Sequence, residues 1–172
     1  MQQSGRLPVR SSRRAAICAA AGVCLLSTVA TAANGHVATL DERIQGSESV
    51  VVATVRSVTP EWRENEFGDR VIVSRLELAV DETLKGGATR TVWMELEGGT
   101  LDGLTLHVSS LPLVEQPGVR AVFFLDPASR GVYRPHLRGQ GILFLDEENA
   151  VRGTSLRVDD IRTRARALAA GR

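Results

Sequence analysis

The chain has 172 residues, 24% of them charged, and a formal net charge of +1. This near-balance of acidic and basic residues argues against a protein that binds nucleic acid through a strongly basic surface. The two cysteines, Cys18 and Cys24, both lie close to the N-terminus.

Residues 1–32 have the features of a secretory signal peptide. Four arginines precede an apolar run from Ala15 to Val29, and Ala30-Thr31-Ala32 then forms a small-x-small cleavage site. The apolar run is shorter than the roughly 20 residues that a membrane-spanning helix needs. We therefore predict an exported protein, periplasmic or extracellular, with no stable membrane anchor after cleavage.

Cleavage changes the composition of the mature chain. It removes both cysteines, so the mature protein has no disulfides, and it removes four arginines, which changes the formal net charge from +1 to −3. About 140 residues remain, which suits one domain that rests on its own hydrophobic core. A mildly acidic exported chain is not expected to bind nucleic acid.

Hydrophobic periodicity places a short helix and several strands along the mature chain. Residues 33–47 are expected to form an N-terminal tail and a short helix, with Thr39 as its N-cap and Gly46 at its end. The run Val50–Val58 predicts a strand that ends before Pro60. A polar hairpin loop is expected at 61–70, strands at 71–86, 89–97 and 119–126, and two further strand candidates at 131–137 and 141–153.

Residues 98–118 form a glycine-framed loop between two of these strands. Gly98 and Gly99 let the chain leave the preceding strand through backbone angles that other residues avoid. Four leucines of the loop either cap an open end of the domain or present part of the apolar set to a partner. Capping is favoured because four exposed leucines would invite aggregation; they are Leu104, Leu106, Leu111 and Leu113.

Residues 154–172 are expected to form a C-terminal helix. Asp159 and Asp160 suit its N-terminus, and Ile161, Ala165 and Leu168 repeat as an apolar stripe. The arginines off this stripe allow two interpretations: a basic helix on a membrane surface, or a helix that docks on the domain with its arginines in water. The stripe favours docking.

Together these elements predict a mainly β fold. We expect a small five- to six-stranded antiparallel OB-like barrel over residues 48–153, with a short N-terminal helix and a C-terminal helix packed on it. Closure of the barrel would hide the edges of the strands.

The order of four segments resembles a family of uncharacterised secreted bacterial proteins. The segments are SESVVVATVRSVTPEW, LELAVDETLKG, GGTLDGLTLHVSSLPLVEQPGVRAVFFLD and RGQGILFLD, and the resemblance covers roughly Glu48 to Asp146. This arrangement is similar to the netrin-like OB barrel of the tissue inhibitors of metalloproteinases. Those inhibitors chelate the protease zinc with an N-terminal cysteine. The mature chain here has no cysteine, so neither that mechanism nor any inhibitory residue carries over.

Two tryptophans are the strongest pointers to a binding surface. Trp93 alternates with Val92 and Met94, so it faces away from the core, where an aromatic side chain can anchor an interface. Trp62 stands in the predicted polar loop, where an aromatic residue is less expected. The predicted partner-binding set consists of Trp62, Trp93, Leu104, Leu106, His107 and Leu111.

Neither a catalytic residue nor a cofactor is predicted. The three histidines lack metal-ligand spacing, and Ser109 and Ser110 have no evident base. One metal site is conditional on the cleavage position. Cleavage after residue 33 would give the mature N-terminus Asn34-Gly35-His36, whose amine, amides and imidazole suit Cu(II) or Ni(II).

We therefore expect an exported, non-catalytic binding module whose partner is a protein, with an exported peptidase as one partner class. A periplasmic metal-binding protein that uses its mature N-terminus is the first alternative. A hydrolase with an unrecognised site is the least favoured. The sequence does not indicate an oligomeric state.

Overall fold

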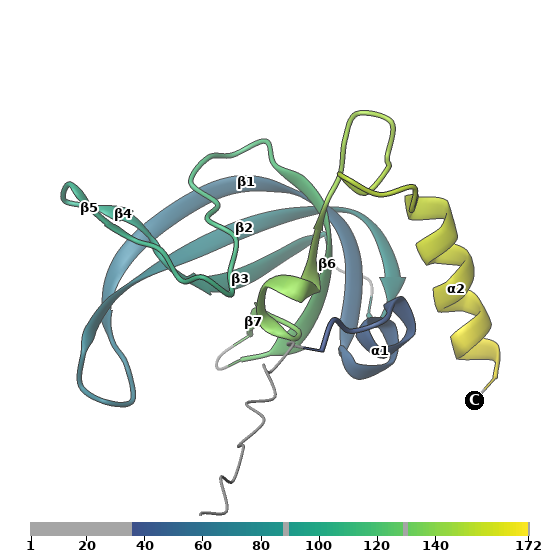
Figure 1. Ribbon diagram of the computed structural model, residues 1–172, viewed down its shortest axis with the longest axis horizontal. Helices are drawn as coiled ribbons and strands as arrows, with labels where there is room; N and C mark the ends of the chain where they lie inside the picture. The colour runs from purple at the N-terminus through teal and green to yellow at the C-terminus, as the bar shows by residue number, and fades with distance from the viewer. Residues whose placement is uncertain (1–35, 88–89, 129–130, 172) are drawn as a thin grey trace, which may run out of the picture. The chain divides into compact units, whose positions relative to one another are not determined.

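The computed structural model describes residues 36–87, 90–128 and 131–171, which form one mainly β unit (Figure 1). The predicted signal peptide lies outside the described residues. The elements are α1 (Leu40–Gly46), β1 (Ser49–Glu64), β2 (Arg70–Lys85), β3 (Thr91–Glu97), β4 (Gly99–Leu101), β5 (Leu104–Leu106), β6 (Arg120–Pro127), β7 (Val132–Pro135), a 3₁₀ turn η1 (Arg138–Gly141), β8 (Ile142–Phe144) and α2 (Val158–Ala170).

Six of the strands form one mixed sheet in the order β1-β2-β3-β7-β6-β8, and β4 and β5 form a separate two-stranded hairpin. The expected purely antiparallel arrangement is wrong, because β3 and β7 pair in parallel at Trp93–Val132 and Met94–Tyr133. The chain between β3 and β7 passes through β4, β5 and β6. No short turn joins β3 to β7, so nothing in the connection makes these two strands antiparallel.

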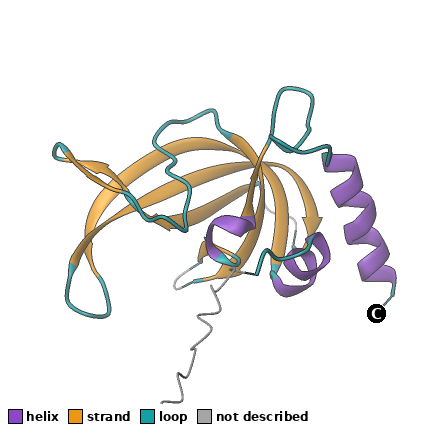
Figure 2. Cartoon of the chain, in the orientation of Figure 1, coloured by secondary structure: helices purple, strands orange, loops and turns teal. Residues whose placement is uncertain are grey.

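The sheet curves back on itself at one end but does not form the expected closed barrel (Figure 2). β1 pairs with β6 over Ser49–Thr54, on the edge opposite β2. Beyond that stretch, from Ser57 to Glu64, the only strand of the main sheet that pairs with β1 among the described residues is β2. β2 still pairs with β3 from Ser74 onward, so the ends of β1 and β2, residues 61–64 and 70–73, extend beyond β3 and β6 as a two-stranded arm.

β1 continues through Pro60, where the sequence predicted its end. Pro60 pairs with Ser74 in the part of β1 that has a strand on one side only, and an edge is where a proline without an N–H is tolerated. The predicted loop shrinks to a turn in which the Asn65 side chain accepts hydrogen bonds from the Phe67 and Asp69 amides, both at 2.9 Å. Trp62 consequently lies on a strand and not in a loop.

The hydrophobic core has two parts, one on each face of β1 and β6. On the inner face, residues such as Val51, Leu76 and Phe123 pack with Leu111 and Val114 from the long loop. On the other face, residues of β1 and β6 pack against the two helices and the segment that precedes α2. Because both faces are covered, β6 is buried continuously from Ala121 to Leu125, as the nearly all-apolar sequence of this strand predicted.

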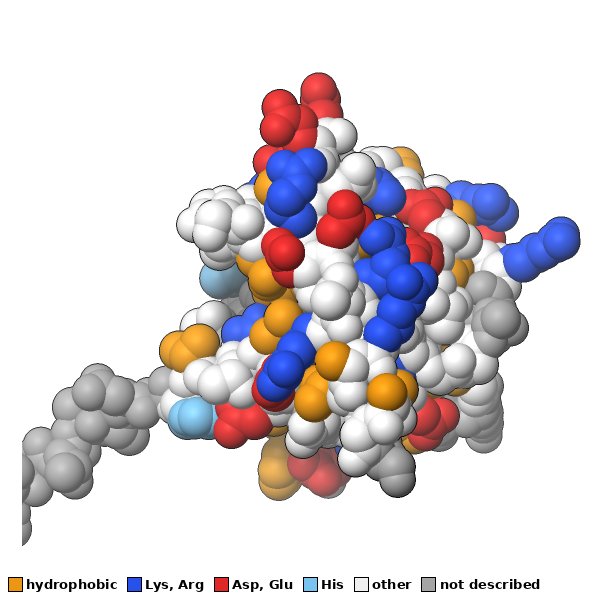
Figure 3. Space-filling view, turned by 90° about the vertical axis from the view of Figure 1, so that its right-hand side faces the viewer, with side chains coloured by type: hydrophobic (Ala, Val, Ile, Leu, Met, Phe, Trp, Pro, Cys, Tyr) orange, Lys and Arg blue, Asp and Glu red, His pale blue; other side chains and the backbone are white. Residues whose placement is uncertain are grey.

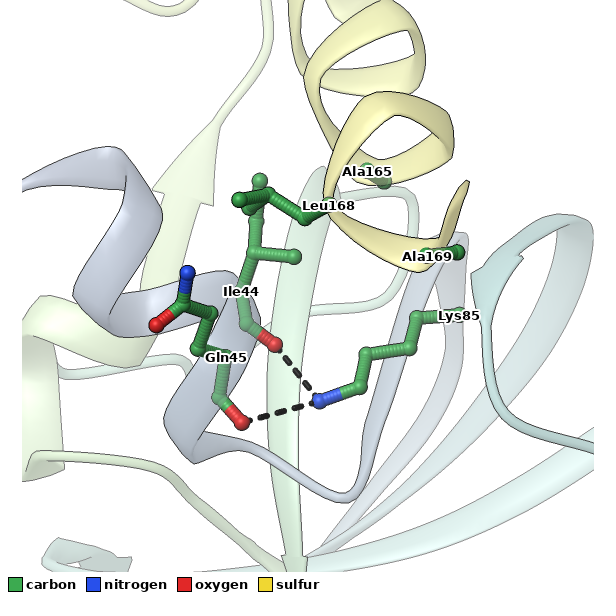
Figure 4. A pocket seen from close by; sticks show the side chains of 6 residues that line it. All are labelled: Ile44, Gln45, Lys85, Ala165, Leu168 and Ala169. Carbon is green, nitrogen blue, oxygen red and sulfur yellow. Dashed lines mark hydrogen bonds between the residues drawn. The ribbon is translucent and has the colours of Figure 1, made fainter. Parts of the chain in front are cut away.

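α1 forms as the sequence indicated. The Thr39 side chain accepts a hydrogen bond from the Glu42 amide and the Glu42 side chain accepts one from the Thr39 amide, which is a complete capping box. At the other end, the Lys85 ammonium donates to the carbonyl oxygens of Ile44 at 2.6 Å and Gln45 at 3.1 Å (Figure 4). This charge near the C-terminus of α1 stabilises the exposed carbonyls of that helix.

α2 docks on the domain, as the apolar stripe predicted. Ile161 and Ala165 are buried in the second part of the core, with Leu168 packed beside them. Two arginines expected to be in water instead form ion pairs, Arg162 with Glu82 on β2 at 2.6 Å and Arg164 with Asp41 on α1. Figure 3 looks onto this side and shows acidic side chains among the basic ones, an arrangement unlike the uniformly basic face of a membrane-surface helix.

The Arg162–Glu82 pair makes the docking of α2 dependent on pH. Hydrogen bonds from the Arg162 guanidinium hold the pKa of the Glu82 carboxyl below its ordinary value of 4.5, against a smaller opposing effect of burial. The pair therefore stabilises the fold fully above that ordinary value, and the contribution is lost as the pH falls through the lowered pKa. We expect Arg162→Gln to lower the melting temperature above about pH 5 and to have a progressively smaller effect as the pH falls through the lowered pKa of Glu82.

Thermal unfolding of the native chain and the variant across this pH range measures the difference. Arg134→Gln, which changes an exposed arginine on β7, is the control. A difference between native and Arg162→Gln that stays constant with pH would contradict the expectation.

Candidate functional site

The end of the sheet remote from α2 carries two hairpins that project together (Figure 1). One is the arm of β1 and β2, and the other is the β4–β5 hairpin. We call the surface formed by Trp62, Phe67, Arg70, Asp102 and Leu104 the distal surface. It brings together side chains from segments about 40 residues apart in the sequence.

Trp62 lies at the centre of the distal surface. It stands on the inner face of β1 opposite Ile72. The Arg70 guanidinium lies over its ring, 4.7 Å from the ring centroid. Its indole Nε1 donates a hydrogen bond to the Asp102 carboxylate at 3.0 Å, which links the arm to the β4–β5 hairpin. A stacked cation and one hydrogen bond therefore fix the ring in one orientation.

The β4–β5 hairpin is held over the inner face of the sheet by Gly98 and Gly99. The Gly98 amide donates to the Ile72 carbonyl at 2.8 Å, and the Ser74 hydroxyl donates to the Gly98 carbonyl at 2.7 Å. Gly99 has a φ of +140°, and a Cβ at this position would lie 2.4 Å from the Ser74 Oγ. Only glycine fits both the backbone angle and the space, which is what the paired glycines of the sequence are for.

A hollow of about 220 Å³ opens between the arm and the hairpin. Leu104, which is part of its lining on the β4–β5 hairpin, is 59% exposed. Phe67, which is 80% exposed, lies outside this lining in the adjoining β1–β2 turn. The residues that line the hollow are Trp62, Arg70, Val71, Ile72, Leu104, Thr105 and Leu106.

The glycine-framed loop both caps the core and presents apolar groups. Leu111 is 9% exposed and packs in the inner part of the core. Leu106 is half-buried at the hollow, and Leu104 and Leu113 are exposed. The sequence favoured capping for the whole loop, but the structure divides the four leucines between the two roles.

The predicted partner-binding residues do not all lie together. Trp62, Leu104 and Leu106 line one hollow. Trp93 faces outward, as expected, but on the opposite face of the sheet, where its ring lies 4.7 Å beneath the Arg75 guanidinium. His107 is exposed in the loop and Leu111 is buried in the core, so neither is among the residues that line the hollow.

Three residues of the distal surface were missed by sequence reasoning. Phe67 sits in a strongly polar turn, and a lone aromatic residue in such a turn was the available signal. Arg70 and Asp102 carried no signal of their own. Their roles depend on contacts with Trp62, which follow from the strand register and from the position of the β4–β5 hairpin.

The conditional metal site is described only in part, since Asn34 and Gly35 lie outside the described residues. His36 is exposed, and its Nε2 lies 3.2 Å from a Glu42 carboxylate oxygen. Within the described part of the chain, no three His, Cys, Asp or Glu side chains are grouped as a metal site.

His136 is better placed than the sequence suggested. Its Nδ1 lies 2.9 Å from the Asp126 Oδ2, and both side chains are largely buried. A His–carboxylate pair is also the orienting half of a catalytic triad. Here, however, Nε2 faces Gly46, where an added Cβ would lie only 2.5 Å away. The pair therefore holds the end of α1 against β6 and β7.

Neither described helix is long and apolar enough to cross a membrane. No protein-family model matches the sequence, and no curated protein matches it. The resemblance to secreted bacterial proteins with a netrin-like barrel stays a prediction.

Proposed function

We propose that the chain is an exported, non-catalytic binding module that engages a protein partner through the distal surface. The observation that supports this most is the exposed apolar side chain of Leu104 in the lining of a hollow beside a fixed tryptophan, with the exposed Phe67 in the adjoining β1–β2 turn. Exposed apolar groups gathered around a hollow are typical of interaction sites. Aromatic anchors surrounded by polar residues are typical of the centres of protein interfaces.

The order around Trp62 also favours binding. A side chain that is free before binding loses conformational entropy when a partner immobilises it, at a cost of roughly 0.5–1.5 kcal/mol. Trp62 is already held by Arg70 and Asp102, so little of that cost remains. The hollow beside it is therefore pre-formed for a side chain of the partner.

An OB-like fold of the sheet is part of the same proposal. The long, bent β1 pairs with β2 on one edge and with β6 on the other, and the loop after β3 crosses the inner face. This arrangement supports an open derivative of the expected barrel. Under the netrin-like resemblance, an exported peptidase is one class of partner.

The test is a pull-down from the exported fraction with the mature chain as bait. We expect Leu104→Asp and Phe67→Asp each to lose a partner that the native chain retains, because each change replaces an apolar contact with a carboxylate that loses its hydration on binding. Val37→Asp, at another exposed apolar position (73% exposed), is the matched control and should retain the partner.

The result that contradicts the proposal is equally specific. Retention of the partner by Leu104→Asp and Phe67→Asp, with loss in Trp93→Ala, would move the interface to the outer face of the sheet. Circular dichroism of each variant shows whether the fold is kept.

A further inference from the structure

We propose that the partner of the distal surface is a basic protein, which inserts one apolar side chain flanked by lysine or arginine into the hollow beside Trp62. This inference rests on the proposed function and adds the chemistry of the partner. It is carried by the charge around the hollow, the size of the hollow and the arrangement of its lining.

The rim of the distal surface is acidic. Glu64, Glu66 and Asp69 surround the β1–β2 turn and Asp102 lies in the β4–β5 turn, and all four are exposed. None of the four forms an ion pair with any residue that the structure describes.

The nearby arginines do not neutralise this rim. Arg63 is engaged by Glu61 at 2.5 Å and by Glu95 at 2.8 Å. Arg70 lies over the Trp62 ring and keeps its positive charge, so it offsets one of the four carboxylates. The rim therefore keeps an excess of negative charge, which attracts a cationic partner and raises its rate of association.

The hollow is too small for a typical cofactor or metabolite. Its volume of about 220 Å³ lies below the roughly 300–1,000 Å³ of most small-molecule pockets. Val71, Ile72, Leu104 and Leu106 give it an apolar lining, and the Trp62 ring forms part of its wall. A single aliphatic side chain fits this space and this lining.

Two other occupants are disfavoured by the same charges. An anionic membrane surface attracts basic segments and would repel the acidic rim. A second copy in a two-fold symmetric contact would place the same patch of each chain against the other, so the unpaired carboxylates would face one another. A basic protein partner avoids both conflicts.

Trp62 fluorescence reports the binding directly. The chain has two tryptophans, so Trp93→Phe leaves Trp62 as the only one. We titrate this variant with the peptides RRLRR, RRGRR and EELEE, each capped at both ends. We expect a saturable change with RRLRR, at least tenfold weaker binding of RRGRR, and none with EELEE. Raising the salt from 50 to 500 mM should weaken RRLRR binding by roughly tenfold.

Charge reversal then locates the site. In the Trp93→Phe background, Glu64→Lys with Glu66→Lys should weaken RRLRR binding at least tenfold. Glu147→Lys with Glu148→Lys reverses two exposed acidic residues in the turn after β8, and it should leave the affinity within twofold. Leu104→Asp should abolish the gain in affinity that the leucine of the peptide provides, so that RRLRR and RRGRR bind with equal affinity.

Several outcomes overturn the inference. With the peptides, these are the absence of a saturable change up to millimolar RRLRR, equal binding of EELEE, and an equal loss of affinity in the control charge reversal. Binding of the native chain to phosphatidylglycerol vesicles that Leu104→Asp abolishes would indicate a membrane surface instead. A dimer in sedimentation that Leu104→Asp dissociates would indicate a second copy of the chain. The pull-down decides the proposed function separately. If a partner is lost with Leu104→Asp but retained by the double variant Glu64→Lys with Glu66→Lys, the proposed binding module is supported. The inference that its partner is basic is then contradicted.

Discussion

Replacing Phe123 with alanine is expected to lower the free energy of unfolding by about 3–5 kcal/mol. Phe123 is fully buried on β6, on the face that packs in the inner part of the core. The truncation removes a large apolar surface and leaves a cavity that the covered strand cannot collapse to fill. A domain of this size is stable by only about 5–15 kcal/mol, so the loss is a large fraction of the total.

Urea denaturation measures this effect, and the chain provides a matched control. Phe67→Ala makes the same chemical change at a position that is 80% exposed, where a change within about 0.5 kcal/mol is expected. Equal destabilisation by the two substitutions would show that β6 is not the centre of the core.

Replacing Gly99 with alanine is expected to destabilise the fold by about 3 kcal/mol, the upper end of the range for a strained backbone position. Two effects combine: a φ of +140°, which L-residues rarely adopt, and the 2.4 Å approach of the new Cβ to the Ser74 Oγ. Relief of the clash requires a shift of the β4–β5 hairpin or of the Ser74 hydroxyl, which donates the hydrogen bond that holds the Gly98 carbonyl against β2. The same variant should therefore also weaken binding at the distal surface.

Substitutions at two other glycines separate the effect of the positive φ from the effect of the steric clash of the new Cβ. Gly103 has a φ of +76° with open space around it, so Gly103→Ala should cost only the backbone term, about 1–2 kcal/mol. Gly87 has open space and no positive φ, and Gly87→Ala should be nearly neutral. If Gly99→Ala cost no more than Gly103→Ala in urea denaturation, the close contact with Ser74 would not constrain the hairpin.

Local patterns predicted most of the elements. The alternation of Ile72, Ser74, Leu76 and Leu78 marked one buried face of β2, and all four are buried. The Thr39–Glu42 spacing indicated the capped start of α1. These features depend on residues only a few positions apart in the chain, so they can be recognised from the sequence alone.

Long-range pairing was not predictable in the same way. The parallel contact of β3 with β7 joins strands about 40 residues apart, and no turn signal encodes it. The continuation of β1 through Pro60 depends on the absence of a second neighbouring strand there, which is a property of the sheet and not of the segment.

The candidate site shows the same division. Trp62 and Leu104 could be singled out as an aromatic and an apolar residue in polar or glycine-rich surroundings. Their proximity depends on Gly98 and Gly99 and on the contacts of these glycines with β2. Trp93 was as strong a candidate as Trp62 in the sequence. Side chains alternate along β3, however, and Trp93 lies on the face opposite to Val92 and Met94, away from the hollow.

The central claim, that the distal surface contacts a protein partner, is tested most directly by site-specific photo-crosslinking. A photoreactive side chain replaces Leu104 in one variant and Val37 in a matched control, and each is irradiated in the exported fraction. The account predicts a discrete adduct of higher mass from position 104, suppressed by an excess of native chain, and none from position 37. A discrete adduct from position 37 alone would contradict it.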